Sequence, residues 1–367
     1  MPGRNRDVKI IIAGGGTGGH LFPGVAVAEE FLKRDRKNNV LFIGTERGLE
    51  GKILPDMGFQ LRTINVEGIK GKGLMKSIGA SFKIPGSLVQ SWMIIREFCP
   101  DIVIGVGGYA SGPAVITAHF MGIKTAIAEQ NAIPGITNRI LGRFVDRAFL
   151  TFPKTKKWFS EEKAVVTGNP IRNGFSKVEE KTERIDDRFA LLIFGGSQGA
   201  HAINRAVLDS VKYLKEIKDK LKIIHQTGND DLEWVTEVYT DCEMDAEVLP
   251  FIDDMASAYR SADLLICRAG ATTIAEITAS GKAAILVPFP FATGDHQTEN
   301  ARVLTAAGAA EMIPERDLSG ELLAEVIRRF YRNTSAIGKM EEKSASLGNI
   351  RAAADIVDEC LALVTVS

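Results

Sequence analysis

Cysteine is scarce in this sequence, and no two cysteines have the spacing of a metal or redox motif. The 367 residues include only Cys99, Cys242, Cys267 and Cys360. This excludes a disulfide framework or a cysteine zinc site and favours reduced, mostly buried thiols of a cytosolic protein. DxD, HExxH and paired histidines are also absent, so we expect no metal ion.

Net charge and long apolar runs are missing as well. The formal net charge is −1, which gives no reason to expect nucleic acid as a partner of the whole chain. The first apolar run is too short for a signal peptide, and no stretch reaches the ~18–20 apolar residues of a membrane span. Any membrane contact is therefore expected to be peripheral.

The chain instead alternates short apolar strands with longer helical segments. Its length favours two domains. Continuous apolar strands between helices predict parallel sheets covered on both faces, so the expected fold class is α/β with two doubly wound domains facing across a cleft. The predicted strands are 8–13, 39–44, 101–106, 125–130, 147–152 and 164–168, then 189–195, 221–228, 246–251, 263–268, 283–289 and 309–313.

Glycine is abundant, with 36 residues, and it gathers after strands. In the first loop Gly14, Gly16 and Gly19 form GxGxxG between a strand and a helix, where the backbone can approach a ligand closely. A nicotinamide or flavin enzyme is one interpretation, with Glu46 as the ribose-binding acid. A structural tight turn is another.

A P-loop ATPase fits less well, because His20 follows the last glycine where a lysine is needed. Histidine can take up a proton near neutral pH, which favours activation of an acceptor hydroxyl. An ordinary capping or core histidine is the alternative. Two more glycine loops, 105–113 and 195–200, suit two substrates held from opposite domains.

Several longer motifs follow one another along nearly the whole chain. They are GGTGGHLFPG (15–24), GVGGYASGP (105–113), EQNAIPGITN (129–138), GNPIR (168–172), GGSQGA (195–200), FIDDM (251–255), CRAGATTIAE (267–276), VPFP (287–290) and DHQTENA (295–301).

Together these motifs resemble one family of bacterial glycosyltransferases of peptidoglycan synthesis. The family transfers N-acetylglucosamine from UDP-N-acetylglucosamine to lipid I, the undecaprenyl-diphosphate-linked N-acetylmuramoyl-pentapeptide, which gives lipid II. The resemblance implies two Rossmann-like domains (GT-B type): 1–172, with a final helix of about 350–367 packing back on it, and 173–349.

The resemblance also implies a donor site. A helix that opens after Gly270 would offer amides to the UDP diphosphate, Glu276 would bind the ribose hydroxyls, and the Ile252 backbone would contact uracil. The alternative for Glu276 is a solvated helix carboxylate. The expected UDP-N-acetylglucosamine residues are Thr17, Gly18, Gly19, Asn131, Arg172, Ser197, Ile252, Ala271, Thr272, Thr273, Ile274, Ala275, Glu276 and Gln297.

The acceptor is expected on the N-terminal loops, with inversion at the anomeric carbon. His20 is the first candidate for the general base and Glu129 the second. The family usually has HEQN, whereas this chain has Ala128 before Glu129, so position 128 supplies no histidine here. No cofactor is implied. The expected acceptor-diphosphate residues are Gly15, Gly16, Gly107, Gly108 and Tyr109.

A lipid-linked acceptor implies a peripheral protein on the cytoplasmic face of the plasma (inner) membrane. The segment 68–98 mixes basic with apolar residues, which suits an anionic membrane surface. A core helix with a solvated lysine face is the alternative. Other cell-wall synthesis proteins are candidate partners. Another transferase of the same architecture and a nonenzymatic UDP-sugar sensor remain as alternative functions. The residues that suggest membrane contact are Lys70, Lys72, Lys76 and Lys83 with Leu74, Met75, Ile78, Phe82 and Ile84.

Overall fold

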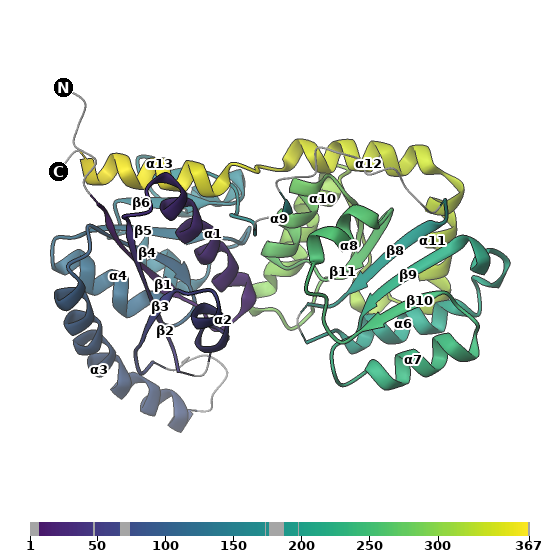
Figure 1. The fold of residues 1–367 in the computed structure, drawn as a ribbon, viewed down its shortest axis with the longest axis horizontal. Helices are drawn as coiled ribbons and strands as arrows, with labels where there is room; N and C mark the ends of the chain where they lie inside the picture. Colours follow the sequence, from purple (N-terminus) through teal and green to yellow (C-terminus); the bar gives the residue numbers. More distant parts are fainter. Residues whose placement is uncertain are drawn as a thin grey trace. The chain divides into compact units, whose positions relative to one another are not determined.

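The computed structural model describes residues 7–46, 48–66, 74–172, 174–175, 187–196 and 198–365, with side chains from 85 onward in the third range. The chain forms two compact units. Unit 1 comprises 1–172 and 351–367, and unit 2 comprises 173–350. Figure 1 shows a separate parallel sheet in each unit. This confirms the predicted α/β fold class with two doubly wound sheets.

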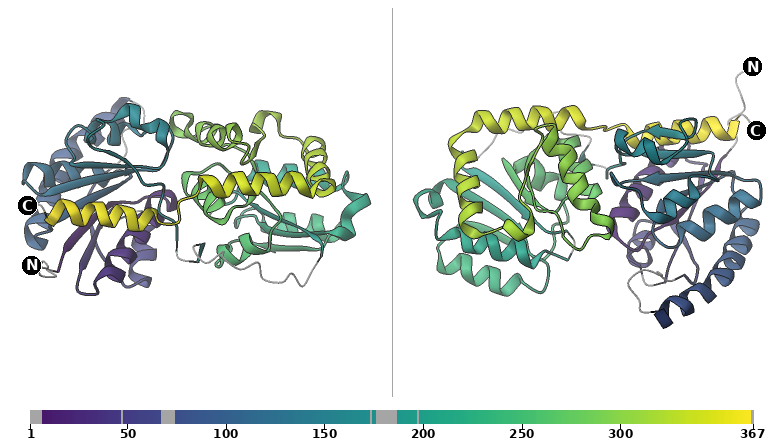
Figure 2. Two further views of the ribbon diagram at one scale, coloured as in Figure 1. Left: turned by 90° about the horizontal axis from the view of Figure 1, so that it is seen from above. Right: turned by 180° about the vertical axis from the view of Figure 1, so that it is seen from behind.

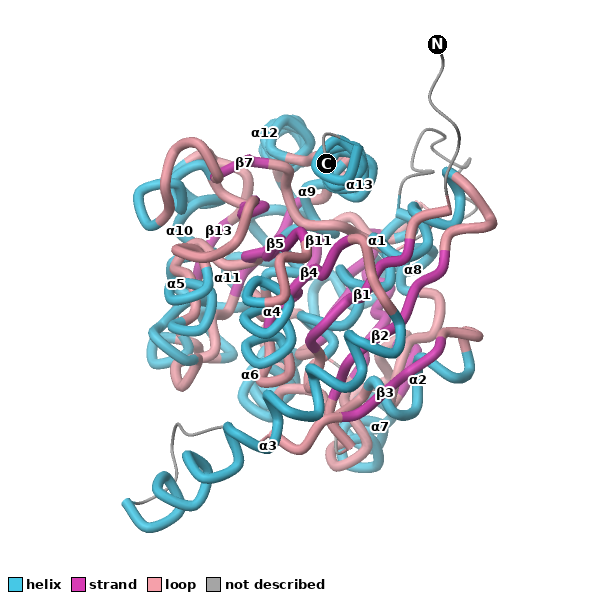
Figure 3. The backbone as a smooth tube through the Cα atoms, turned by 90° about the vertical axis from the view of Figure 1, so that its left-hand side faces the viewer, coloured by secondary structure: helices cyan, strands magenta, loops and turns pink. Residues whose placement is uncertain are grey.

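The sheet of unit 1 is parallel throughout, in the order β3-β2-β1-β4-β5-β6-β7 (Figure 3). Its strands are β1 Lys9–Gly14, β2 Asn39–Gly44, β3 Gln60–Thr63, β4 Ile102–Gly107, β5 Lys124–Glu129, β6 Arg147–Leu150 and β7 Ala164–Val166. β3 is an addition to the predicted strands. Its sequence QLRT is polar and largely exposed at the sheet edge, so it lacks the apolar run on which the prediction depended.

Alternate residues of the unit 1 strands point to opposite faces of the sheet. On one face Ile10, Ile12 and Phe42 pack with apolar residues of three helices, and on the other Ile11 and Leu41 pack with those of three more. The first group of helices is α1 Gly18–Arg34, α2 Glu50–Asp56 and α13 Ala352–Thr365; the second is α3 Leu74–Phe98, α4 Ser111–Phe120 and α5 Ile136–Leu141. A 3₁₀ helix, η1 Pro153–Trp158, precedes β7.

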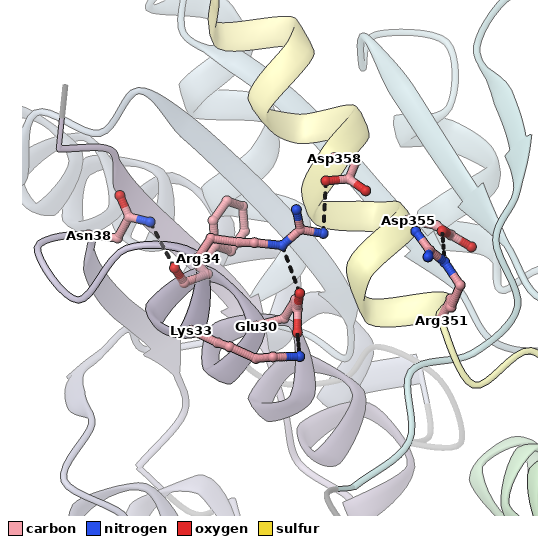
Figure 4. A network of polar contacts seen from close by, with 8 residues as sticks. Glu30, Lys33, Arg34, Asn38, Arg351, Asp355 and Asp358 are labelled. Carbon is pink, nitrogen blue, oxygen red and sulfur yellow. Dashed lines mark hydrogen bonds and ion pairs between the residues drawn. The ribbon is translucent and has the colours of Figure 1, made fainter. Parts of the chain in front are cut away.

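Helix α13 completes the core of unit 1 from the far end of the described chain. Ile356, Val357 and Cys360 are buried with the residues of β1 and α1. At the rim, Arg34 of α1 bonds to Glu30 and forms an ion pair of 2.9 Å with Asp358 (Figure 4). Because the apolar residues are fully buried and the charged pair is half-exposed, burial contributes most of the docking energy.

Unit 2 repeats the architecture, with the parallel order β10-β9-β8-β11-β12-β13. Its strands are β8 Phe189–Phe194, β9 Leu221–Gln226, β10 Ala246–Leu249, β11 Leu264–Cys267, β12 Ala283–Leu286 and β13 Glu311–Met312. Its helices are α6 His201–Val211, α7 Leu232–Asp241, α8 Met255–Ser261, α9 Ala271–Ser280, α10 His296–Ala306, α11 Gly320–Arg332 and α12 Thr334–Leu347. Short 3₁₀ helices are η3 Lys215–Lys220, η4 Thr293–Asp295 and η5 Glu315–Asp317.

One face of the unit 2 sheet carries the main apolar cluster. Leu191, Ile223 and Ile266 pack there with residues of α6, α7, α11 and α12. Figure 2 shows α12 and α13, both yellow, as two distinct helices. Helix α12 belongs to unit 2 and α13 to unit 1.

Candidate functional site

The strand order brings two glycine loops together in unit 1. β1 and β4 are neighbours, and the chain leaves them toward opposite sides of the sheet, which opens a crevice at their carboxyl ends. The first loop follows β1 and the second follows β4. The Gly15 amide donates a hydrogen bond of 3.3 Å to the Gly107 carbonyl oxygen, so the two loops are in direct contact.

This contact requires glycine. Gly14 has φ +151°, and a Cβ there would lie 2.3 Å from the Gly107 carbonyl oxygen. Gly108 has φ +82°, and its Cβ would lie 2.4 Å from the Gly15 oxygen. A side chain at either position would force the loops apart. The predicted acceptor residues of both loops therefore form one cluster.

His20 lies in this cluster, although not in the loop itself. Helix α1 begins at Gly18 with Thr17 as its N-cap, so Gly18, Gly19 and His20 form its first turn. A Cβ on Gly107 would lie 2.5 Å from the His20 Nδ1, which places the partly buried imidazole against the second loop. Tyr109, two residues further along this loop, is 56% exposed.

The structure corrects one part of the predicted acceptor chemistry. The amides of Gly15 and Gly16 both donate within the protein: that of Gly15 to Gly107, and that of Gly16 to Glu50 Oε2 at 2.7 Å. In this conformation they are not available to a diphosphate. No local pattern in the sequence points to Glu50 as the partner of this loop, because Gly16 lies 34 residues earlier in the chain.

Glu129, the second candidate base, is held by its own loop. Its carboxylate accepts hydrogen bonds from the Asn131 amide at 3.0 Å, from the Gly135 amide at 3.1 Å and from Asn138 Nδ2 at 2.8 Å. The side chain is 3% exposed, and burial raises the pKa of its carboxyl group above the usual 4.5. Its geometry is that of an anchor for the EQNAIPG segment.

Two further residues of unit 1 have defined surroundings. Gln130 is buried and donates through Nε2 to the Val106 oxygen at 3.0 Å, which ties the EQNAIPG segment to the second glycine loop. The guanidinium of Arg172 lies 4.8 Å from the centre of the Phe22 ring in a cation–π contact.

In unit 2 the same topology places the third glycine loop next to the CRAG turn, because β8 and β11 are neighbours. Ser197 of this loop lies outside the described residues. Gln226 is 1% exposed and joins two predicted donor segments. Its Nε2 donates to the Gly196 oxygen at 2.8 Å, and its Oε1 accepts from the Ile252 amide at 2.8 Å. The backbone amide of Ile252 therefore already donates a hydrogen bond within the protein.

The remaining predicted donor residues gather around the start of α9. This helix has Gly270 as its N-cap and presents Ala271, Thr272 and Thr273 in its first turn, where amides have no acceptor within the helix. Ile274, Ala275 and Glu276 are buried. At 3% exposure Glu276 is not the solvated carboxylate of the alternative interpretation.

The VPFP segment faces the same end of unit 2. Gln297, at the start of α10, accepts a hydrogen bond of 2.9 Å from the Phe289 amide, so its Nε2 remains the group directed to other partners. Arg268 donates through Nη1 to the carbonyl oxygens of Val287 at 3.2 Å and Pro288 at 3.3 Å. These bonds join the CRAG turn to the VPFP segment.

Comparison with known proteins identifies the family. The model of the glycosyltransferase family 28 N-terminal domain matches residues 10–150, and that of the C-terminal domain matches residues 190–359. The chain belongs to glycosyltransferase family 28. This excludes the nicotinamide or flavin interpretation, and Glu46, its proposed ribose ligand, is an exposed residue beyond β2.

Individual relatives of this glycosyltransferase agree over nearly the whole chain. The UDP-N-acetylglucosamine–N-acetylmuramyl-(pentapeptide) pyrophosphoryl-undecaprenol N-acetylglucosamine transferase of Syntrophus aciditrophicus is 64% identical over 97% of this chain and 99% of its own. The enzyme of that name from Myxococcus xanthus is 48% identical over 97% and 93%. A crystal structure of MurG from Acinetobacter baumannii is 33% identical, with a TM-score of 0.79 over 96% and 99%.

Two further observations concern the residues that the structure describes. Within the described residues, no group of three or more His, Cys, Asp and Glu side chains could hold a metal ion. Asp254 of the Asp253-Asp254 pair caps α8 by accepting a bond of 3.0 Å from the Ser257 amide. Nor does any helix in the described ranges combine the length and apolar character that a membrane span requires.

Proposed function

We propose that this glycosyltransferase transfers N-acetylglucosamine from UDP-N-acetylglucosamine to the 4-hydroxyl of the N-acetylmuramoyl-pentapeptide of lipid I, giving lipid II and UDP in peptidoglycan synthesis. The observation that carries the proposal is the 64% identity, over 97% of this chain, to the Syntrophus aciditrophicus enzyme whose name states this transfer. A sensor without turnover is disfavoured by that identity.

Unit 2 would hold the nucleotide sugar. The first turn of α9, at Ala271, Thr272 and Thr273, suits the diphosphate, since a helix N-terminus points backbone amides and positive potential toward an anion. As the anomeric C–O bond to UDP breaks, the same groups would stabilise the charge that develops on the leaving oxygen. Glu276 would accept bonds from the ribose, and the Ile252 backbone would contact uracil. Gln297 Nε2 would donate to a sugar hydroxyl.

Residues of unit 1 would complete the donor contacts. We propose Thr17, Gly18, Gly19, Asn131 and Arg172 for this role. Ser197 is proposed from the resemblance of its motif alone.

Unit 1 would hold the acceptor, with His20 as the general base. The acceptor 4-oxygen attacks the anomeric carbon from the face opposite UDP, a new C–O bond forms as the old one breaks, and the hydroxyl proton passes to an imidazole nitrogen of His20. What supports His20 over Glu129 is geometry: His20 is only partly buried beside the glycine loops, whereas Glu129 is 3% exposed and uses its oxygens within its own loop.

The acceptor diphosphate would then contact Gly107, Gly108 and Tyr109 of the second loop. Tyr109 is exposed in the second loop, and its hydroxyl can donate a hydrogen bond to a phosphate oxygen. Gly15 and Gly16 shape the cluster through their internal bonds.

We further propose that the protein works as a peripheral protein on the cytoplasmic face of the plasma membrane. On α3 the side chains of Val89, Trp92 and Met93 are 51%, 41% and 57% exposed at helical spacing, so they form one apolar strip. Such a strip suits the interface of an anionic bilayer. The basic and apolar side chains of the segment 68–84 on which this prediction first depended lie outside the described residues.

The function is tested by incubating the purified protein with UDP-N-acetylglucosamine and a lipid I analogue. UDP-glucose and UDP-N-acetylgalactosamine serve as donor controls, and each arm is repeated with EDTA. We expect a disaccharide product and UDP only with UDP-N-acetylglucosamine, with most of the rate kept in EDTA. Absence of product would contradict the proposal; loss in EDTA with recovery in Mg²⁺ would contradict its metal-free form.

A further inference from the structure

The carboxylate of Glu50 lies beneath the first glycine loop and contacts two separate segments. The side chain is fully buried, at 0% exposure. Oε2 accepts from the Gly16 amide at 2.7 Å, while Oε1 accepts from the Thr45 amide at 2.9 Å and from the Thr45 hydroxyl at 3.0 Å. Glu50 thus joins the loop after β1 to the loop after β2.

Three glycines make room for this carboxylate. A Cβ on Gly15 would lie 2.6 Å from the Glu50 Cδ, one on Gly44 would lie 2.6 Å from Cγ, and one on Gly48 would lie 2.0 Å from Oε2. Gly44 is the last residue of β2, and Gly48 lies between β2 and α2. The close fit explains why both chain segments that line the Glu50 carboxylate contain glycine.

Both oxygens of the carboxylate act as acceptors for backbone or hydroxyl donors. Across the described residues no ion pair involves Glu50. A charged acceptor strengthens each of these bonds relative to a neutral one. The Gly16 amide stands directly before Thr17, the N-cap of α1, and four residues before His20. The bond therefore fixes the backbone from which the proposed base projects.

From these contacts we infer that Glu50 is a positioning residue for the acceptor half of the reaction. It holds the first glycine loop so that the His20 imidazole and the second loop keep their relation, and it touches neither substrate. The inference rests on the proposed function, and it predicts that Glu50 affects the acceptor and the chemical step without affecting UDP binding by unit 2.

Glu50→Gln is the discriminating variant because it keeps the shape and removes one acceptor. If the amide oxygen of the glutamine accepts the bonds from Thr45, its NH₂ group faces the Gly16 N–H. Both groups are donors, so the bond to Gly16 is lost. Glu46→Gln is the matched control, since Glu46 lies four residues away and is exposed. Both variants are assayed with the lipid I analogue, and the Kd for UDP is measured by calorimetry.

We expect Glu50→Gln to lower kcat/KM for the acceptor at least tenfold per folded molecule, with the Kd for UDP within twofold of wild type and Glu46→Gln unchanged. Hydrogen exchange of segment 14–20 should be faster in Glu50→Gln alone. Should Glu50→Gln not fold, Glu50→Asp replaces it, since its carboxylate is one methylene shorter and the same changes are expected.

Equal acceptor kinetics and equal exchange in the two glutamine variants would overturn the inference, as would a parallel loss of UDP affinity. Wild-type turnover in the same assay separates this result from failure of the proposed function. The exchange measurement needs no substrate and tests the loop contact even if the wild type shows no turnover.

Discussion

Gly107 and His20 are in direct contact, since a Cβ on Gly107 would lie 2.5 Å from the His20 Nδ1. The imidazole is therefore placed by backbone of the second loop as well as by its own helix. Gly107 also has φ +95°, which side chains rarely adopt. Gly107 therefore both allows the backbone conformation of the second loop and leaves room for the His20 ring.

His20→Ala is expected to lower kcat at least tenfold, the usual minimum for losing a general base. The Kd for UDP should not change, because the predicted nucleotide contacts lie mainly in unit 2. Steady-state kinetics with the lipid I analogue provide the measurement. His119→Ala is the control, as His119 lies near the end of α4 in ring contact with Phe120 and Phe144. An unchanged kcat would transfer the base to Glu129.

Gln226→Leu is expected to weaken UDP binding about tenfold or more. The leucine leaves the Gly196 oxygen and the Ile252 amide without their bonds, and a buried group left unsatisfied costs about 1–3 kcal/mol. Isothermal titration with UDP measures the change. Gln90→Leu is the control, since Gln90 bonds to the Asn65 amide in unit 1. Equal affinities in the two variants would show that Gln226 does not organise the donor segments.

The apolar strip of α3 gives a membrane prediction. Replacing both Trp92 and Met93 with serine should reduce sedimentation with anionic liposomes at least threefold, because it removes apolar area from the bilayer interface. Phe291→Ser is the comparison, as Phe291 is 82% exposed in unit 2. If the two proteins sediment alike, the strip is not the membrane contact.

His225 makes stability depend on pH. Asn204 donates through Nδ2 to the Thr227 oxygen at 2.9 Å and to Asp231 at 2.7 Å, so its Oδ1 is the acceptor for His225 Nε2–H at 3.1 Å. The other ring nitrogen accepts from the Tyr239 hydroxyl at 3.0 Å. Burial lowers the pKa of His225 from 6.5 to about 3, opposed by the charge of Asp231.

The unfolded chain therefore binds a proton at His225 between about pH 6.5 and 3, whereas the folded chain does not. Unfolding is favoured as the pH falls below 6.5, by about 1.4 kcal/mol per unit or roughly 2 kcal/mol at pH 5. Urea titrations at pH 7 and 5 should show this loss in wild type. In His225→Gln, which can keep both bonds without titrating, the loss should be smaller by that amount. An identical loss in both would contradict the assignment.

Helix α13 allows burial and surface charge to be compared. Ile356→Ala should lower the free energy of unfolding of unit 1 by about 2–5 kcal/mol, because it leaves a cavity in the core. Asp358→Ala, which removes the half-exposed partner of Arg34, should cost less than about 1 kcal/mol. Denaturant titration of the full chain measures both. A larger loss for Asp358→Ala than for Ile356→Ala would contradict the conclusion that apolar burial contributes most of the docking energy of α13.

The strands could be predicted because a strand that is buried on both faces is a continuous apolar run in the sequence. Each predicted segment overlaps an observed strand. β3 was missed because it is short, polar and at an edge. The glycine loops after strands could be located from the sequence, but the start of α1 at Gly18 could not, so the position of His20 in the first helical turn was not predicted. The roles of Glu50 and Gln226 were not predicted for another reason. Glu50 lies 34 residues from its partner Gly16, and Gln226 lies 30 and 26 residues from Gly196 and Ile252, so no local sequence pattern indicates these contacts.

The return of α13 to unit 1 has a consequence for synthesis on the ribosome. Residues 1–172 emerge first, yet Ile356, Val357 and Cys360 of their core are translated only after all of unit 2. At roughly 5–20 residues per second, the nascent first unit waits about 10–35 s for its last helix. During that interval the apolar side chains of β1 and α1 that pack with α13 lack this helix, so the first unit completes its core only after the second unit has been translated.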